Sequence, residues 1–262
     1  KFKNYKKSKY ALSVNSCTAA LHLSLIYCGI GYNDEVITTP MTFASTINSI
    51  ILSGAKPVLA DIDPNNFNID PTQIEKKITK RTKAILIVHL AGLPCDMTSI
   101  MKIVKKYKLK LIEDCAHSIE SKYQNKHVGN FGDTGCFSFY TTKNLTTGEG
   151  GMIICNKDSI YKKTRVARLH GLSKDAWKRY LPESVKTPIK FQHYDVTEIG
   201  LKYNMIDINA AMGIVQLKKL ENSWKKRKKI FELYKKKVAS LPIKTQNFVG
   251  KDIKHAYHLF LI

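Results

Sequence analysis

The sequence predicts an α/β domain built on a mostly parallel sheet that is flanked by helices. Short apolar blocks of strand length, such as residues 83–88 and 110–113, alternate along the chain with amphipathic segments of helix length. This alternation is typical of strand–helix–strand units. Hydrophobic residues make up 44% of the 262 residues. That fraction is sufficient for a core and argues against a disordered chain.

The apolar blocks and the periodic segments can be assigned in order. Seven strands are expected at residues 10–14, 35–39, 56–60, 83–88, 110–113, 134–139 and 151–156. Six helices are expected at residues 17–28, 43–53, 71–78, 97–107, 159–169 and 207–238. Asp70 before Pro71, and Asp96 before the fourth helix, are start signals because a side-chain oxygen at this position accepts from a free N–H of the first turn.

Two further stretches do not fit this alternation of strands and helices. Residues 171–200 are polar and lack a clear period, and a loop of that length in a compact domain is usually functional or packed against a partner. Residues 255–262 form an apolar run that predicts a further strand with nothing to pair with. Both ends therefore look cut, and we expect the chain to be a piece of a longer protein.

The charge is strongly positive, with 43 Lys and Arg against 21 Asp and Glu and a net charge of +22. A balance of this kind raises the expectation of nucleic-acid or other anionic partners. However, the excess is mostly lysine spread over predicted helix faces, and residues 224–237 predict an amphipathic helix with a basic outer side. We favour solvated helix faces over nucleic-acid binding.

The six cysteines are scattered over apolar segments without a C-x-x-C pair, and no histidine cluster has metal-ligand spacing. This pattern predicts buried free thiols in a reducing compartment and no metal site. No apolar run reaches the length of a membrane span, and no signal-peptide pattern follows the basic first residues. We therefore expect a soluble, cytoplasmic protein.

Three segments carry residues suited to chemistry. Asp114 ends an apolar strand, where it is either a ligand group or a helix cap. Lys143 lies in a Ser/Thr/Gly loop; most lysines are solvated surface charges, but one held in such a loop can have a depressed pKa and act as a Schiff-base nucleophile. Residues 15–23 combine a strand end, small polar residues and a helix start, which is either a phosphate site or an ordinary cap.

Taken together, these three segments match what pyridoxal 5′-phosphate (PLP) requires of a protein. Its phosphate needs N–H groups and hydroxyls, as residues 15–23 offer. Its ring nitrogen needs a carboxylate such as Asp114 to remain protonated, and its aldehyde needs an amine such as that of Lys143.

At this point the sequence resembles the DegT/DnrJ/EryC1/StrS family of sugar aminotransferases, which have the type I aminotransferase fold. The resemblance covers nearly the whole chain. It is carried by NSCTAALHL, YNDEVITTPMTF, GAKPVLADID, EDCAHS, GDTGCFSFYTTKNLTTGEGG, RLHGLSKDAW and GLKYNMIDINAAMGIVQLKKLE, in that order. It implies a PLP-binding large domain over residues 1–238 and the beginning of a truncated small C-terminal domain over residues 239–262.

The resemblance also implies roles for single residues. Lys143 matches the lysine that bonds to the cofactor, Asp114 the partner of the ring nitrogen, and His117 the contact to the phenolic oxygen. Phe43 falls where the family stacks an aromatic side chain on the cofactor. The positions that match phosphate-binding residues are Cys17, Thr18 and Ser138.

Three more residues are implied with less detail. The GLKYNM segment is similar to one that reaches the neighbouring subunit's cofactor. Lys202 and Asn204 are therefore candidates to complete the phosphate site across a homodimer with shared active sites, although which of them makes the contact is open. His170 and the loop after it are expected near the sugar.

The implied function is transfer of an amino group, with glutamate as the expected donor, to a nucleotide-linked keto-sugar. Relatives that dehydrate sugars carry His in place of the lysine, so Lys143 favours transamination. The most similar members aminate C4 of a UDP-sugar. Amination at C3, another nucleotide, an inactive fragment, and a nucleic-acid-binding or regulatory protein that kept the fold are the alternatives.

Overall fold

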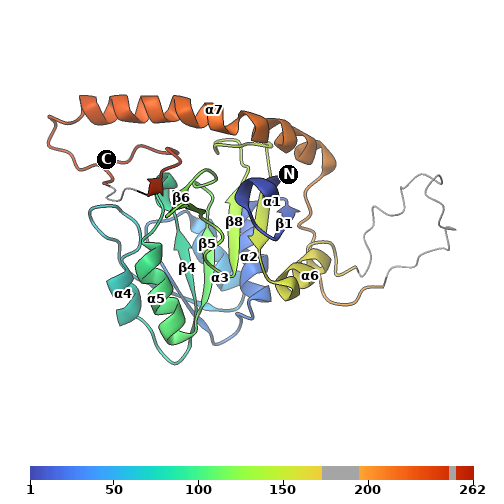
Figure 1. Cartoon of the computed structure of the whole chain (residues 1–262). Coiled ribbons are helices and arrows are strands. Elements are labelled where there is room, and N and C mark those ends of the chain that lie inside the picture. Colours follow the sequence, from blue (N-terminus) through green and yellow to red (C-terminus); the bar gives the residue numbers. More distant parts are fainter. Residues whose placement is uncertain (173–194, 248–251) are drawn as a thin grey trace.

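A computed structural model describes residues 1–172, 195–247 and 252–262 (Figure 1). A central sheet is sandwiched between helices, and one long helix runs across the top of the molecule. The long polar stretch expected at residues 171–200 falls largely outside the described residues.

The central sheet has seven strands and confirms the predicted mixed, mostly parallel type. Its order is β1-β9-β8-β5-β4-β2-β3. From β8 to β3 all neighbours are parallel, whereas β9 is antiparallel to both β8 and β1. The strands are β1 (Tyr10–Val14), β2 (Glu35–Thr38), β3 (Lys56–Leu59), β4 (Thr82–Val88), β5 (Lys110–Asp114), β8 (Thr134–Ser138) and β9 (Gly151–Cys155).

Helices cover both faces of this sheet, close to the predicted positions. They are α2 (Cys17–Tyr27), α3 (Ala44–Leu52), α4 (Pro71–Lys76), α5 (Met97–Tyr107) and α6 (Asp158–Ala167). The α2, α3 and α6 helices contribute to one buried cluster, and α4 and α5 to another. The predicted caps are confirmed, since Asp70 accepts from Thr72 N and Asp96 from Ser99 N.

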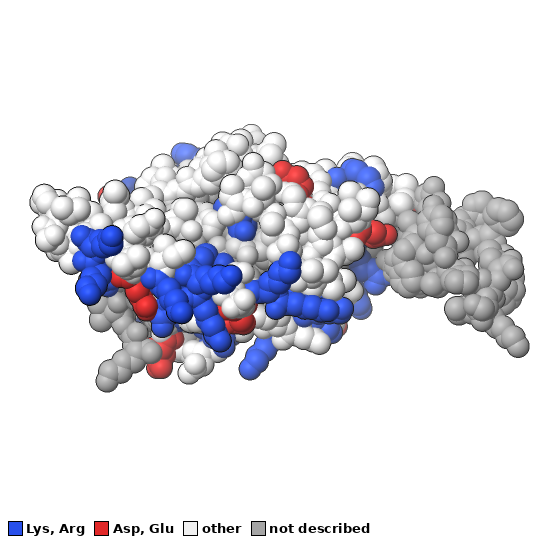
Figure 2. Space-filling model, turned by 90° about the horizontal axis from the view of Figure 1, so that it is seen from above, with Lys and Arg blue, Asp and Glu red and all other residues white. Residues whose placement is uncertain are grey.

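The long helix α7 (Asp207–Lys237) has 31 residues and a length of about 46 Å at 1.5 Å per residue. Its described lysines face solvent, and Figure 2 shows Lys and Arg side chains gathered in a band across this side of the molecule. This agrees with the interpretation of solvated basic helix faces. None of the described helices combines the length and apolarity that a bilayer crossing requires.

The prediction of a strand at residues 255–262 is wrong. The strand β10 (Ile253–Lys254) ends before them and pairs with β6 (Lys122–Tyr123), which in turn pairs with β7 (Lys126–His127). The residues after β10 instead bond to the 3₁₀ turn Leu90–Gly92: Ala256 N donates to Gly92 O, and His258 N to Ala91 O. The positive φ of 55° at Tyr257 interrupts an extended ladder.

The helix α1 (Phe2–Lys6), one more element, was not predicted. Phe2 packs edge-on against Phe137 with ring centroids 5.2 Å apart. The buried Lys6 amine donates to Ile119 O at 2.9 Å. All six cysteines are buried and unpaired, as expected. The division of the chain after residue 238 stays a prediction.

Candidate active site

A cavity of about 380 Å³ lies where β4, β5 and β8 end and where α2 and α3 begin. Ligands of open α/β sheets bind at this edge, beyond the carboxyl ends of the parallel strands. Seven residues predicted from the sequence line this one cavity: Cys17, Thr18, Phe43, Asp114, His117, Ser138 and Lys143.

Asp114 is the last residue of β5 and is buried. Its carboxylate accepts from Ala116 N at 3.0 Å and from the Thr46 hydroxyl at 3.2 Å, and the Cys17 thiol lies 3.9 Å away. Burial raises the pKa of Asp114, and these donors together with the Lys143 charge lower it in part. Among the described residues Asp114 forms no ion pair. A cationic ligand would therefore offset the cost of burying this charge.

Lys143 lies in the loop between β8 and β9, where its backbone N donates to Tyr140 O at 2.9 Å. Its side chain is half-buried, and burial lowers its pKa, while the charge of Asp114 raises it. A lower pKa increases the fraction of neutral amine, which is the nucleophilic form. The loop thus places an amine on the same cavity as the Asp114 carboxylate.

The start of α2 offers donors for an anion. The Ser16 hydroxyl accepts from Ala19 N at 3.1 Å and Ser16 O accepts from Ala20 N. The first N–H groups of the helix, at Cys17 and Thr18, have no carbonyl partner within it. A Cβ at Gly151 would come within 2.5 Å of Ser16 C, so only glycine lets β9 pass this close to the helix start.

His117 contributes a hydrogen-bond donor to the cavity. Ala91 N donates to its Nδ1 at 3.2 Å, so a neutral ring carries its proton on Nε2. Burial lowers the pKa of His117 to about 2, which keeps the ring neutral. Ala91 has φ 56°, and this left-handed geometry lets its N–H point at His117 while its carbonyl accepts from the C-terminal segment.

These groups fit PLP on three counts. Free N–H groups at a helix start, with the Ser138 hydroxyl, suit a phosphate. A buried carboxylate without a cation suits a protonated ring nitrogen, and a half-buried amine suits an aldehyde. Phe43 is 77% exposed at the edge of the cavity, where a flat aromatic ligand would cover it.

Three predicted residues do not line this cavity. The Lys202 amine donates to Asn204 Oδ1 at 2.7 Å, and Lys202 O accepts from Asn15 Nδ2 at 3.4 Å. The pair thus lies beside Asn15, which precedes the N-cap Ser16 of α2. His170 is exposed, and its N–H donates to Leu201 O. Their roles remain predictions.

Sequence reasoning missed several groups at the cavity. Thr46 touches Asp114 from the first turn of α3, and its spacing of three residues from Phe43 is a signal that could have found it. Tyr140 and Glu149 belong to the lysine loop and line the cavity. His258 stacks on His117 with ring centroids 4.4 Å apart, a contact between distant segments for which the sequence has no local signal.

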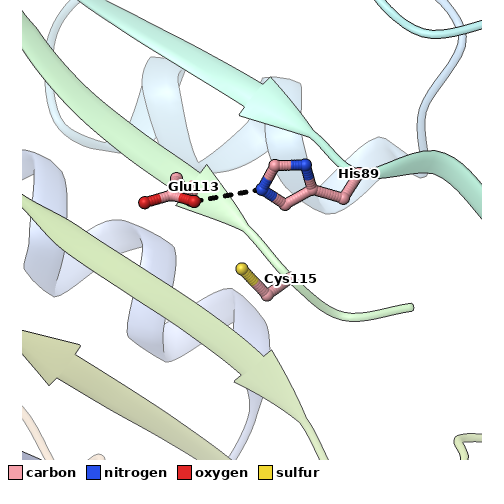
Figure 3. A group of neighbouring side chains, drawn as sticks. All are labelled: His89, Glu113 and Cys115. Carbon is pink, nitrogen blue, oxygen red and sulfur yellow. Dashed lines mark hydrogen bonds and ion pairs between the residues drawn. The ribbon is translucent and has the colours of Figure 1, made fainter. Parts of the chain in front are cut away.

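A second buried group lies on the other side of β5 (Figure 3). His89, Glu113 and Cys115 have donor atoms within 4.8 Å of one another. However, His89 Nδ1 already accepts from Cys95 N, and its Nε2 lies 3.1 Å from Glu113 Oε2. Glu113 also accepts from three backbone N–H groups. The lone pairs are in use, so we assign this group a structural role.

A larger cavity of about 600 Å³ lies elsewhere, among residues that include Asp63, Asp96 and Asp252. The described residues that line it contain neither lysine nor histidine. Its size therefore does not make it the better candidate for catalysis.

Comparison with known proteins agrees with the geometry. The sequence model of the DegT/DnrJ/EryC1/StrS aminotransferase family matches residues 1–262, and the chain belongs to this family. The aminotransferases of the family depend on PLP. The chain is 44% identical over 261 residues to the spore coat polysaccharide biosynthesis protein SpsC of Bacillus subtilis, with all of the chain and 66% of SpsC covered. It thus spans about two thirds of that relative's length.

Solved structures share the fold. The putative sugar aminotransferase Spr1654 from Streptococcus pneumoniae, in its PLP form, superposes with a TM-score of 0.87 at 29% identity, over 99% of this chain and 67% of that one. Helicobacter pylori PseC, an aminotransferase involved in the biosynthesis of pseudoaminic acid, gives 0.88 at 33% identity, over 99% and 66%. The predicted type I fold is confirmed.

Proposed function

We propose that this chain is the cofactor-binding part of an aminotransferase that transfers the amino group of glutamate to a nucleotide-linked keto-sugar. The observation that carries the proposal is that Lys143 and Asp114 lie on one cavity together with the free N–H groups at the start of α2. Family membership supports the reaction type. The fold alone would not, since one fold hosts many functions.

Each residue has a part in this reaction. Bound PLP supplies an electron sink beside the carbon that loses or gains a proton. Lys143, whose pKa is lowered by burial, would hold the cofactor through its amine and would serve as the general base and acid that moves this proton. Asp114 would face the ring nitrogen and keep it positively charged, and Nε2–H of His117 would donate to the phenolic oxygen.

The substrate is proposed to be a UDP-linked sugar with its ketone at C4. The support comes from the sequence around His170 and Asn204, which resembles that of family members that act on such sugars. SpsC is named for polysaccharide biosynthesis and PseC for pseudoaminic acid, and both names fit an amino-sugar product. Amination at C3 and other nucleotide carriers are the alternatives.

We further propose a homodimer in which Lys202 and Asn204 reach the partner's phosphate site. Exposed apolar side chains close to this region support a subunit contact, among them Ile206, Ile208 and Met212. Mixing Lys143→Ala chains with Lys202→Ala chains tests it. If sites are shared, mixed dimers regain activity because one of the two sites then holds both native lysines; a mixture without any recovery would contradict sharing.

The first experiment is the absorbance spectrum of the chain with added PLP. A visible band from the lysine-bound cofactor should appear, bleach when glutamate is added, and be missing from Lys143→Ala. Lys102→Ala, which removes an exposed lysine on α5, is the matched control and should keep the band.

The alternatives give different results. A folded chain without the band would overturn the assignment of Lys143. Salt-dependent DNA binding without the band would favour the nucleic-acid alternative. With the band established, UDP- and dTDP-linked keto-sugars with the ketone at C3 or C4 can be compared as amino acceptors; faster turnover of a C3 ketone would contradict the proposed position.

A further inference from the structure

The segment after β10 places a second histidine next to the cavity. His258 stacks on His117 with ring centroids 4.4 Å apart and an interplanar angle of 30°. Its backbone N donates to Ala91 O at 3.1 Å, and Ala91 N donates to His117 Nδ1 at 3.2 Å. One residue, Ala91, thus anchors both rings, and the two histidines form a stacked pair.

A chain of polar contacts leads from α7 to this pair. The guanidinium of Arg227 donates to Glu120 Oε1, and Glu120 Oε2 accepts from Asn144 Nδ2 at 2.9 Å. The other end of that amide, Asn144 Oδ1, lies 2.8 Å from His258 Nδ1. Glu120 is buried and Arg227 is part-buried, so water competes little for these contacts.

The donors and acceptors along this chain have a single consistent assignment. Burial raises the pKa of Glu120, and the charge of Arg227 and the Asn144 amide lower it in part. Arg227 is charged at any accessible pH and donates to this carboxylate, which acts as an acceptor. Asn144 must then turn its NH₂ group toward Glu120 and its oxygen toward His258. An oxygen can only accept, so His258 must carry its proton on Nδ1. The lone pair of His258 is therefore on Nε2.

We propose that Glu120 and Asn144 are positioning residues that hold His258 in the Nδ1–H tautomer, stacked on His117 in the opposite tautomer. The two rings then present different groups, since His117 has a donor at Nε2 and His258 an acceptor. The arrangement makes α7 part of the support of the cavity wall, through Arg227. A role of this arrangement in catalysis rests on the proposed function, whereas the assignment of the tautomers does not.

Charges near the pair favour neutral rings. Burial, together with the positive charges of Lys143 and Arg227, lowers the pKa of His258 to about 4. His117 and the buried His255 also have pKa values lowered by burial, with His258 adding to the effect. A neutral pair beside Lys143 adds no repulsion to that amine. With both rings neutral, they can differ only in which nitrogen carries the proton.

The tautomers are measurable in the chain without cofactor. The ¹⁵N shifts of labelled histidine distinguish Nδ1–H from Nε2–H, and the loss of one signal set in His258→Gln assigns them. His258 should be almost wholly Nδ1–H. In Glu120→Gln, a neutral amide lets Asn144 turn either way, so the Nδ1–H to Nε2–H ratio should fall about fivefold to tenfold, as expected for the loss of one hydrogen-bond preference of about 1 kcal/mol.

Two further variants separate positioning from loss of fold. Asn144→Asp keeps an acceptor opposite Nδ1 and should retain the wild-type tautomer, with a higher pKa for His258, whereas Asn144→Leu should lose it. Glu221→Gln is the matched control: this α7 carboxylate accepts from Lys254 and Tyr5 but is not in contact with Asn144, and the His258 tautomer should not change.

A wild-type His258 in the Nε2–H form, or a folded Glu120→Gln chain with an unchanged tautomer ratio, would overturn the inference. Failure of the proposed function looks different, because the expected tautomers would then be seen without a Lys143-dependent absorbance band. Conversely, a normal Lys143-dependent absorbance band together with His258 in the Nε2–H form would contradict only the positioning role of Glu120 and Asn144.

Discussion

Glu113 and Asp114 are neighbours in β5, both buried, yet the pKa of Glu113 is lowered and that of Asp114 is raised. Burial raises both pKa values, and the difference lies in how many hydrogen-bond donors each carboxylate has to lower its pKa again. Glu113 accepts from the N–H groups of Gly129, Phe131 and Gly132 and faces His89. Asp114 accepts from one N–H and one hydroxyl, and its remaining neighbour is the weakly donating thiol of Cys17 at 3.9 Å.

Successive residues of a strand point to opposite faces, so the same strand end supplies one carboxylate to the protein interior and one to a cavity. The first has its hydrogen-bonding capacity filled by the protein and holds the loop around Gly129 against the sheet. For Asp114, the hydrogen bonds offset only part of the cost of burying its charge, and the carboxylate shares the cavity with the Lys143 amine. A perturbed carboxylate in a cleft is the one expected to meet a ligand.

The largest expected effect that tests this contrast is on catalysis. Asp114→Asn removes the charge that holds the ring nitrogen protonated and should lower kcat about 10²- to 10⁴-fold, the usual range for loss of such a group. The fold should be retained, because a buried under-compensated charge is removed. Steady-state rates with a keto-sugar acceptor and a melting curve check the two parts; a variant with full activity would contradict the role of Asp114.

Glu113→Gln should have the opposite profile. An amide cannot accept three N–H bonds and face His89 as well, so the free energy of unfolding should fall by about 3 kcal/mol, as when one partner of a buried charged network is lost. Urea denaturation measures this loss. If Glu113→Gln unfolds at the same urea concentration as wild type, the structural assignment of Glu113 is wrong.

The pH dependence of stability in the chain without cofactor should separate the two carboxylates as well. The pKa of Glu113 is lowered from 4.5, so its contribution is complete above pH 4.5 and is lost as the pH falls through the folded value. The pKa of Asp114 is raised from 3.8, so the folded state is favoured below pH 3.8 and loses that advantage as the pH rises through the folded value.

Unfolding in urea between pH 3.5 and 7 measures both. At pH 7 the Glu113→Gln chain should be less stable than wild type and the Asp114→Asn chain more stable. Both differences should shrink in acid. Differences of the same sign at pH 7 would refute the contrast.

The smallest effect concerns the support of Asp114. Thr46→Val keeps the shape of a buried side chain but removes its hydroxyl donor to Asp114 Oδ2. The loss of one such hydrogen bond costs about 1 kcal/mol, and we expect PLP to bind about fivefold more weakly. A PLP titration followed by absorbance measures it, and Ser53→Ala, which removes a hydroxyl near the end of α3, is a control expected to change nothing.

Most of the central fold was predictable because it depends on local patterns. The seven strands have continuous apolar blocks, and α4 and α5 begin at aspartates whose caps the structure confirms. Asp114 was predictable as a site residue because the carboxyl ends of parallel strands meet at one edge, and Lys143 because it lies in a Ser/Thr/Gly loop after an apolar strand. The resemblance to the family supplied the roles of Cys17, Thr18, Phe43, His117 and Ser138.

The missed parts depend on contacts between distant segments. The five residues of α1 are too few to form a helix alone. Contacts with distant segments hold it, among them Phe2 on Phe137, the buried Lys6 on Ile119 O and Tyr5 on Glu221. The run at residues 255–262 is apolar because it packs on the turn Leu90–Gly92 and on α7, not because it pairs as a strand. The same packing brings His258 onto His117, which no periodicity could indicate.

The order of synthesis gives the contact of His258 with His117 a further consequence. His258 follows Lys143 by 115 residues, so at a synthesis rate of roughly 5–20 residues per second the lysine loop leaves the ribosome roughly 6–23 seconds before the histidine that stacks beside it. During that interval the sheet can form, but His117 at the cavity lacks the ring that stacks on it. The support of His117 is therefore tied to the arrival of the C-terminal segment, and a nascent chain that stops short of His258 has the amine and the carboxylate but not the stacked pair.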